Sequence, residues 1–127
     1  MNDQPDVQSV LGNMKAGLGT LPAAIQLAAT ADPAMVLEQA RSSAFAMPAD
    51  GALDPETRTI VYLAAALAAS NHACVTAMTG KAKLQGIAPA KLLEAFHIAR
   101  YALATRVVGD AEPLLSELAA RASSQAA

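Results

Sequence analysis

Hydrophobic positions recur at helical spacing along most of this chain. In the first such stretch, from about Asp6 to Gly17, the apolar residues lie three and four positions apart, which is the spacing of one face of a helix. A second stretch begins at Pro22. Runs in which Val, Ile, Thr or aromatic residues alternate with polar ones are missing, and such runs are the usual signal for strands. The pattern therefore predicts an all-α protein.

Aspartate–proline pairs mark two of the predicted helix starts. Asp32-Pro33 and Asp54-Pro55 each place a good N-cap before a residue that suits the first helical position. The helix after the first pair is predicted to end near Phe45, and the Pro- and Gly-containing segment 46–54 is predicted to be a loop. The second pair opens a helix that is apolar all round from Ile60 to Ala69. We expect that helix to be buried on most sides.

Three more helices are predicted in the second half of the chain. One begins at Ser70 or Asn71 and ends at Gly86, the next runs from Pro89 to about Arg106, and a shorter one follows Asp110. The last residues, 122–127, are expected to fray. No linker is long enough to divide the chain, so we predict one domain over residues 1–127 with about six helices and a shorter terminal one.

Composition changes this picture in one respect. The chain has 127 residues, of which 54% are hydrophobic but only 3% aromatic, and many of the apolar residues are alanine. Helices faced with small residues bury little area at each contact. We therefore expect some apolar helix surface to be buried between subunits of a homo-oligomer.

Charge and cysteine content limit the classes of partner and location. The net charge is −2 and no basic block is present, so no nucleic-acid partner is expected. The apolar run from Ile60 to Ala69 is about half the ~20 residues that a membrane helix needs, so no membrane association is expected. The N-terminus, "MNDQPD", is unlike a signal peptide. With a single cysteine, these features favour a cytoplasmic protein without an internal disulfide.

The only cysteine lies in the stretch "SNHACVTAMTGK", residues 70–81. If Ser70 or Asn71 caps the helix, Cys74 lies in its first turn, where free backbone N–H groups and the helix dipole favour a thiolate. Lys81 lies on nearly the same face and would add positive potential. One interpretation is a reactive thiol. The other is a small buried residue, which is common for free cysteine.

The two histidines, His72 and His97, are the candidate bases for such a thiol. His72 is too close in sequence to share a helix face with Cys74, and an exposed histidine is the alternative interpretation. His97 could be a general base that folding brings to Cys74, or a surface histidine that pairs with Glu94. Two histidines without a third ligand do not make a metal site, and neither a metal nor another cofactor is expected.

Three stretches resemble a known family. They are "GLGTLPAAIQLAATADPAMV" (17–36), "LDPETRTIVYLAAALAASNHACV" (53–75) and "GIAPAKLLEAFHIARYA" (86–102). Together they resemble the alkylhydroperoxidase D-like branch of the carboxymuconolactone decarboxylase superfamily, over most of residues 7–109. The resemblance implies an oligomeric helical domain. It also implies thiol-dependent reduction of peroxides or disulfides.

The redox motif of that family is only partly present here. By resemblance, the motif is Cys-x-x-Cys-x-x-x-His with a glutamate on the preceding helix. Its second cysteine matches Cys74, whereas Asn71 stands at the first cysteine, Met78 at the histidine and Thr59 at the glutamate. The decarboxylase branch lacks the cysteine pair but also keeps a histidine near Met78. A single cysteine cannot close an internal disulfide, so the family's chemistry is expected to be lost or altered.

Three functions stay open on the sequence. The first is an antioxidant, peroxidase-like enzyme in which Cys74 works with an external thiol and with His72 or His97 as base. The second is a lyase-like reaction in the same pocket, in which Cys74 is incidental. The third is a non-catalytic member that serves assembly or binds a small-molecule ligand.

Overall fold

The computed structural model describes residues 5–126, and this part of the chain is built from helices with no strand. The prediction of an all-α protein is therefore confirmed. The seven helices are α1 (Val7–Leu18), α2 (Ala23–Ala31), α3 (Pro33–Ala46), α4 (Pro55–Ala68), α5 (His72–Leu84), α6 (Pro89–Asp110) and α7 (Glu112–Ala126).

Side-chain caps fix the starts of four helices. Asp6, Asp32, Asp54 and Asn71 each accept a backbone N–H from three residues further on, at N···O distances of 2.7, 3.2, 2.9 and 3.1 Å. Each bond satisfies one of the N–H groups that have no partner at a helix start. The starts predicted near these residues are confirmed.

The C-terminal helices are longer than the sequence pattern predicted. Helix α6 continues to Asp110 rather than ending near Arg106, and α7 has 15 residues and reaches Ala126. The expectation that residues 122–127 fray was therefore wrong for residues 122–126, and Ala127 lies outside the described residues. Gly109 is the one glycine of α6, and one such glycine costs only about 1 kcal/mol. The alanines of α7 are strong helix formers and carry the helix to its end.

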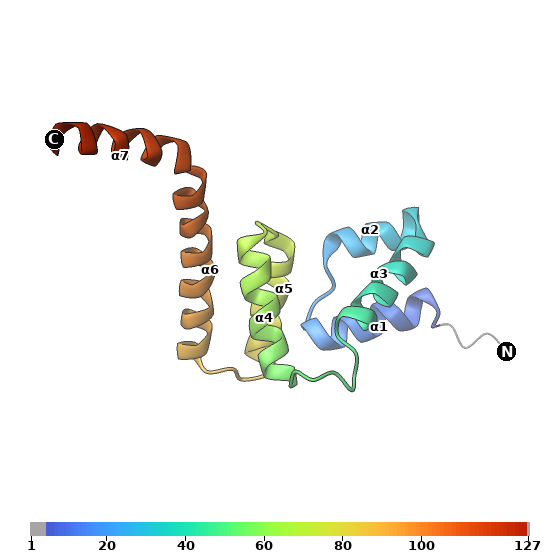
Figure 1. The fold of residues 1–127 in the computed structure, drawn as a ribbon. Helices are drawn as coiled ribbons and strands as arrows, with labels where there is room; N and C mark the ends of the chain where they lie inside the picture. Colours follow the sequence, from blue (N-terminus) through green and yellow to red (C-terminus); the bar gives the residue numbers. More distant parts are fainter. Residues whose placement is uncertain (1–4, 127) are drawn as a thin grey trace.

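Helix α4 is the centre of the arrangement. It packs against α5 and α6, while α1 contacts α5 and α3, and α2 contacts α3. Figure 1 shows α6 on one side of the α4–α5 pair and α1 to α3 on the other. The buried residues at these contacts include four alanines, whose small side chains let the helices approach closely. They are Val10, Val36, Thr59, Leu63, Ala66, Met78, Ala82, Ile87, Ala95 and Ala99.

The apolar run of α4 is less buried than predicted. Leu63 and Ala66 are buried, but Val61 is 51% exposed and Ala65 is exposed as well. The physical reason is that α5 and α6 cover only two sides of α4, so the remaining side of the helix stays open. The expectation that residues 60–69 are buried on most sides was therefore wrong.

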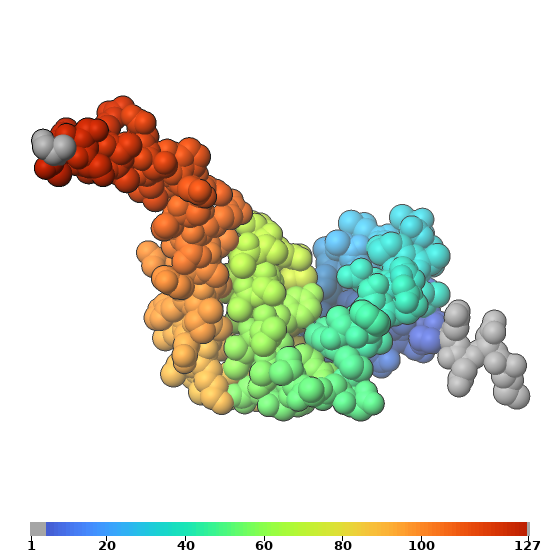
Figure 2. Space-filling view, in the orientation of Figure 1, coloured from blue at the N-terminus to red at the C-terminus, as the bar shows by residue number. Residues whose placement is uncertain are grey.

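The C-terminal arm projects from the rest of the molecule. Helix α6 buries only Ala95 and Ala99, α7 buries no residue, and α7 contacts only α6. In the space-filling view, α7 and the end of α6 extend well beyond the body formed by the other helices (Figure 2). Within residues 5–126, none of the helices combines the length and apolarity that crossing a bilayer would need.

Candidate functional site

The site around Cys74 is built by a tight turn between α4 and α5. Ser70 has a φ of 56°, and the backbone N–H groups of Ser70 and Asn71 donate to the carbonyls of Leu67 and Ala66 at 3.2 and 2.9 Å. A left-handed conformation at a residue other than glycine costs roughly 1–2 kcal/mol. The turn reverses the chain, so that the first turn of α5 lies beside α4.

Cys74 is the third residue of α5. Its backbone N–H donates to Asn71 Oδ1 at 3.1 Å, so the cap of the helix acts directly on the residue that carries the thiol. The side chain is half-buried. Its sulfur therefore lies near the positive end of the helix dipole without being sealed from solvent, which is the setting of many reactive cysteines.

A second polar group meets the thiol from α4. Tyr62 Oη lies 3.1 Å from Cys74 Sγ, and either atom can be the donor of this hydrogen bond. The pKa of Tyr62 is raised from its ordinary value of 10.0 to about 12, first by the hydrogen bond to Cys74, then by burial and by the negative charge of Cys74. A phenol is protonated at neutral pH, so the Tyr62 hydroxyl can donate a hydrogen bond to a sulfur anion or to a molecule bound beside the sulfur.

A shallow hollow adjoins the pair. Its volume is 290 Å³, and its lining residues are Tyr62, Ala65, Ala66, Ala69 and Asn71. Tyr62 and Asn71 both hydrogen-bond to Cys74, so the hollow opens next to the thiol. The volume is close to the lower end of the ~300–1,000 Å³ range of small-molecule pockets.

Neither histidine hydrogen-bonds to the thiol. His72 is the exposed first residue of α5, and His97 is exposed on α6. The His97 ring lies 5.7 Å from the Phe96 ring, centroid to centroid, at 49°. Within residues 5–126, Tyr62 is the side chain that bonds to the sulfur, and His97 makes no hydrogen bond with Glu94. Catalytic roles for His72 and His97 stay predictions.

Comparison of the amino-acid sequence with known protein families identifies the family of this chain. The model of the carboxymuconolactone decarboxylase family matches residues 34–117, which is more than half of the chain. The chain belongs to the carboxymuconolactone decarboxylase family. The resemblance seen in the sequence is thereby confirmed at the level of the family. No curated protein matches the chain.

In this member of the carboxymuconolactone decarboxylase family, the three replaced motif positions have structural roles. The Thr59 hydroxyl is buried and lies 2.7 Å from Gln85 Oε1 and 3.1 Å from the Pro55 carbonyl. Asn71 caps α5, and Met78 is a buried core residue. Neither Thr59 nor Met78 can carry a proton between groups at neutral pH.

Tyr62 is the site residue that sequence reasoning missed. It lies in the run from Ile60 to Ala69, which was treated as uniformly apolar. The available signal was a single phenolic hydroxyl in an otherwise wholly apolar stretch, since a buried hydroxyl needs a partner. The side chain that provides this partner is Cys74, which comes from the next helix of this family member.

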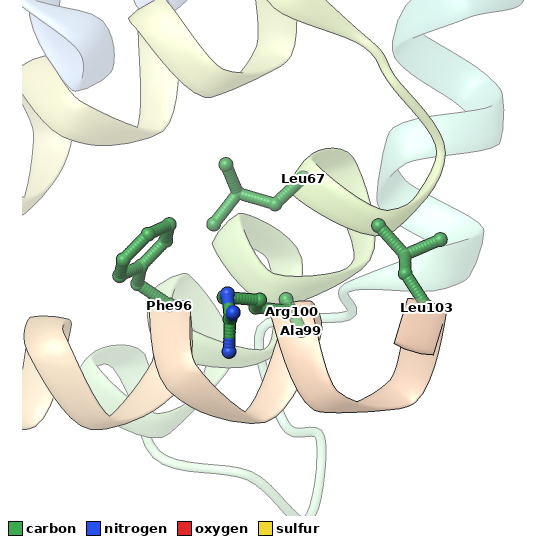
Figure 3. A pocket seen from close by; sticks show the side chains of 5 residues that line it. All are labelled: Leu67, Phe96, Ala99, Arg100 and Leu103. Carbon is green, nitrogen blue, oxygen red and sulfur yellow. The ribbon is translucent and has the colours of Figure 1, made fainter. Parts of the chain in front are cut away.

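A second hollow lies between α4 and α6. It has a volume of 270 Å³ and is lined by Leu67, Phe96, Ala99, Arg100 and Leu103, as Figure 3 shows. Its lining is apolar apart from the Arg100 guanidinium, and it holds no nucleophile. In the part of the chain that the structure describes, no three His, Cys, Asp or Glu side chains are grouped so that they could hold a metal ion.

Proposed function

We propose that this protein is a thiol-dependent oxidoreductase that reduces peroxides through Cys74, with Tyr62 as its proton donor. The observation that carries the proposal is the 3.1 Å contact between Tyr62 Oη and Cys74 Sγ. This contact gives the thiol a neighbour that carries a proton. By resemblance, the family's motif has such groups at the positions of Thr59 and Met78, where this chain has none.

The setting of Cys74 supports the nucleophilic role. A thiolate is the reactive form of cysteine, and a helix N-terminus favours it. Cys74 lies in the first turn of α5 and is half-buried, so its side chain is partly open to solvent and to a small peroxide. The hollow is lined largely by alanine, which favours a peroxide with an apolar group over a highly charged one.

Tyr62 supports the proton transfer. The Cys74 thiolate attacks the peroxide oxygen that carries hydrogen, the O–O bond breaks, and an S–O bond forms to give a sulfenic acid. The departing alkoxide takes a proton from the Tyr62 hydroxyl, which water later restores. A positioned acid of this kind contributes roughly 10²- to 10⁴-fold to a rate. With a pKa of about 12, the phenol is protonated at neutral pH and is still a stronger acid than the alcohol that forms, so the proton transfer to the alkoxide is favourable.

An external thiol must complete the cycle, since the chain has one cysteine. One thiol attacks the sulfur of the sulfenic acid, releases water and leaves a mixed disulfide with Cys74. A second thiol attacks that disulfide and frees Cys74. The net reaction converts one peroxide and two thiols into an alcohol, water and a disulfide, and the two thiols supply the two electrons.

The test measures consumption of cumene hydroperoxide by the purified protein with dithiothreitol as the external thiol. The unmodified protein is expected to consume peroxide, and dimedone is expected to trap a sulfenic acid at Cys74 that mass spectrometry locates. Cys74→Ser is expected to abolish both signals. No consumption and no dimedone adduct in the unmodified protein would refute the proposal.

A non-catalytic role is the second candidate, and one observation favours it. Thr59 and Met78 are buried and serve packing and hydrogen bonding, as expected of a scaffold from which the motif has been lost. This role predicts that Cys74→Ser changes no measurable turnover. The dimedone experiment therefore separates the two candidates.

A further inference from the structure

The hollow between α4 and α6 combines an apolar wall with one charged group. It has a volume of 270 Å³ and shares no lining residue with the hollow beside Tyr62. Leu67 comes from α4, and the other lining residues come from α6. In Figure 3, Leu67 faces the α6 residues, and Arg100 lies between Phe96 and Leu103. An arginine keeps its positive charge throughout the physiological pH range, so the hollow has a permanent cation at its edge.

Arg100 is the arginine for which the fold supplies no partner. Each of the other four arginines donates a hydrogen bond or forms an ion pair, and these are Arg41, Arg58, Arg106 and Arg121. Within residues 5–126, the Arg100 side chain does neither. A guanidinium has five N–H donors in a planar fork that matches a carboxylate. The Arg100 fork is therefore available to an anion from outside the chain.

The two helices that form the hollow place no carboxylate next to this cation. On a helix, residues three and four positions apart are side-chain neighbours, and those of Arg100 include no acid. They are Phe96, His97, Leu103 and Ala104. The one acid of α4 is Glu56 at its start, and it pairs with Lys91. The positive potential at the hollow is therefore not cancelled by a neighbouring acid of α4 or α6.

The rest of the hollow suits an apolar group of limited size. Phe96 is 47% exposed and Leu103 is 40% exposed, so both side chains have carbon surface that water still covers. Covering such surface is favourable. At about 30 Å³ for each molecule of liquid water, a volume of 270 Å³ holds about nine water-sized groups. An aromatic ring with one carboxylate is of this size.

We propose that this hollow binds an apolar monocarboxylate, either an aryl acid or a short alkyl acid. Its carboxylate meets the Arg100 guanidinium, and its apolar body lies against Leu67, Phe96 and Leu103. The lining has no nucleophile and no acid–base pair, so the acid is bound there and not converted. The site is separate from Cys74, and the proposal does not rest on peroxide reduction.

The first test titrates the unmodified protein with benzoate and follows its ¹H–¹⁵N NMR spectrum at constant ionic strength. Benzamide is the matched probe, since it has the same shape without the charge. Benzoate is expected to shift the signals of Phe96, Ala99 and Arg100 in a saturable way, with a Kd on the order of 1 mM for so small a ligand. Benzamide is expected to bind at least tenfold more weakly. The signals of Ala69 and Asn71, at the other hollow, are expected to stay in place.

The second test repeats the benzoate titration with two variants of α6. Arg100→Gln keeps a hydrogen-bonding side chain without the charge and is expected to raise the Kd at least tenfold. Arg106→Gln is the matched control, because it removes a charge from the same helix outside the hollow, and it is expected to keep the parent Kd.

Four results would overturn the proposal. They are the absence of saturable shifts, equal affinities for benzoate and benzamide, a benzoate affinity that Arg100→Gln leaves unchanged, and shifts confined to the signals of Ala69 and Asn71. The comparison of benzoate with benzamide needs no variant. It therefore decides the matter even if Arg100→Gln fails to fold.

Discussion

Replacing Cys74 by alanine is expected to lower the pKa of the Tyr62 phenol from about 12 toward its ordinary value of 10.0. The size of the change follows from the causes of the shift. The largest is the hydrogen bond to Cys74, the second is burial and the third is the negative charge of Cys74. The substitution removes the first and third, so we expect most of the rise in the Tyr62 pKa to disappear. Cys74→Ser keeps a hydrogen-bonding atom without the charge and is expected to give an intermediate value.

The assay is a spectrophotometric titration of tyrosine ionisation near 295 nm. The chain has two tyrosines, so the experiment uses a Tyr101→Phe background. Tyr101 is 70% exposed, and its replacement leaves Tyr62 as the only phenol. Far-ultraviolet circular dichroism at each pH confirms that the protein stays folded. An equal titration midpoint with and without Cys74 would refute the reasoning, because the contact between the two side chains could then not exist in solution.

The same shift makes stability depend on pH in a defined direction. The folded state raises the pKa of Tyr62 from 10.0 to about 12, so between these values the folded protein holds a proton that the unfolded chain has lost. The stabilisation is complete below pH 10 and is lost as the pH rises toward 12. We expect the urea midpoint to fall more steeply over this range in the unmodified protein than in Cys74→Ala, and parallel curves would contradict this.

Three further substitutions test the packing and hydrogen bonds around the site by urea denaturation. Leu63→Ala empties a buried position of α4 and is expected to lower the free energy of unfolding by about 2–5 kcal/mol. The matched Val61→Ala, on the exposed side of α4, is expected to change it by no more than about 0.5 kcal/mol. Equal losses of stability in the two variants would contradict the packing. Asn71→Ala removes the cap of α5 and is expected to cost about 1 kcal/mol, and an unchanged midpoint would argue against the cap. Thr59→Val breaks the hydroxyl contact with Gln85 and is expected to cost about 0.5–1.5 kcal/mol, so a gain in stability would show that this contact contributes nothing.

The helix starts could be predicted from the sequence because their causes are local. An aspartate followed by proline, as at Asp32 and Asp54, caps a helix through atoms only three residues away. The ends of α6 and α7 were predicted less well. Their C-terminal residues carry no strong stop signal, and Gly109 lies inside α6 although glycine more often marks an end.

The site depended on contacts that local sequence does not encode. Cys74 and Asn71 could be placed at a helix start because capping is local. The pairing of Tyr62 with Cys74 depends on how the turn at Ser70 sets α5 against α4, and no spacing rule for a single helix predicts it. The exposure of Val61 likewise depends on how many neighbours α4 has, which its own sequence cannot show.

The measurement that tests the central claim most directly compares peroxide consumption by Tyr62→Phe and Tyr101→Phe under identical concentrations of dithiothreitol. The claim is that Tyr62 supplies the proton for a reaction at Cys74, across the 3.1 Å contact that joins them. It predicts that Tyr62→Phe lowers kcat/KM for cumene hydroperoxide by about 10²-fold or more, while Tyr101→Phe retains the parent rate and Cys74→Ser has none. Equal rates in the two tyrosine variants would contradict the claim.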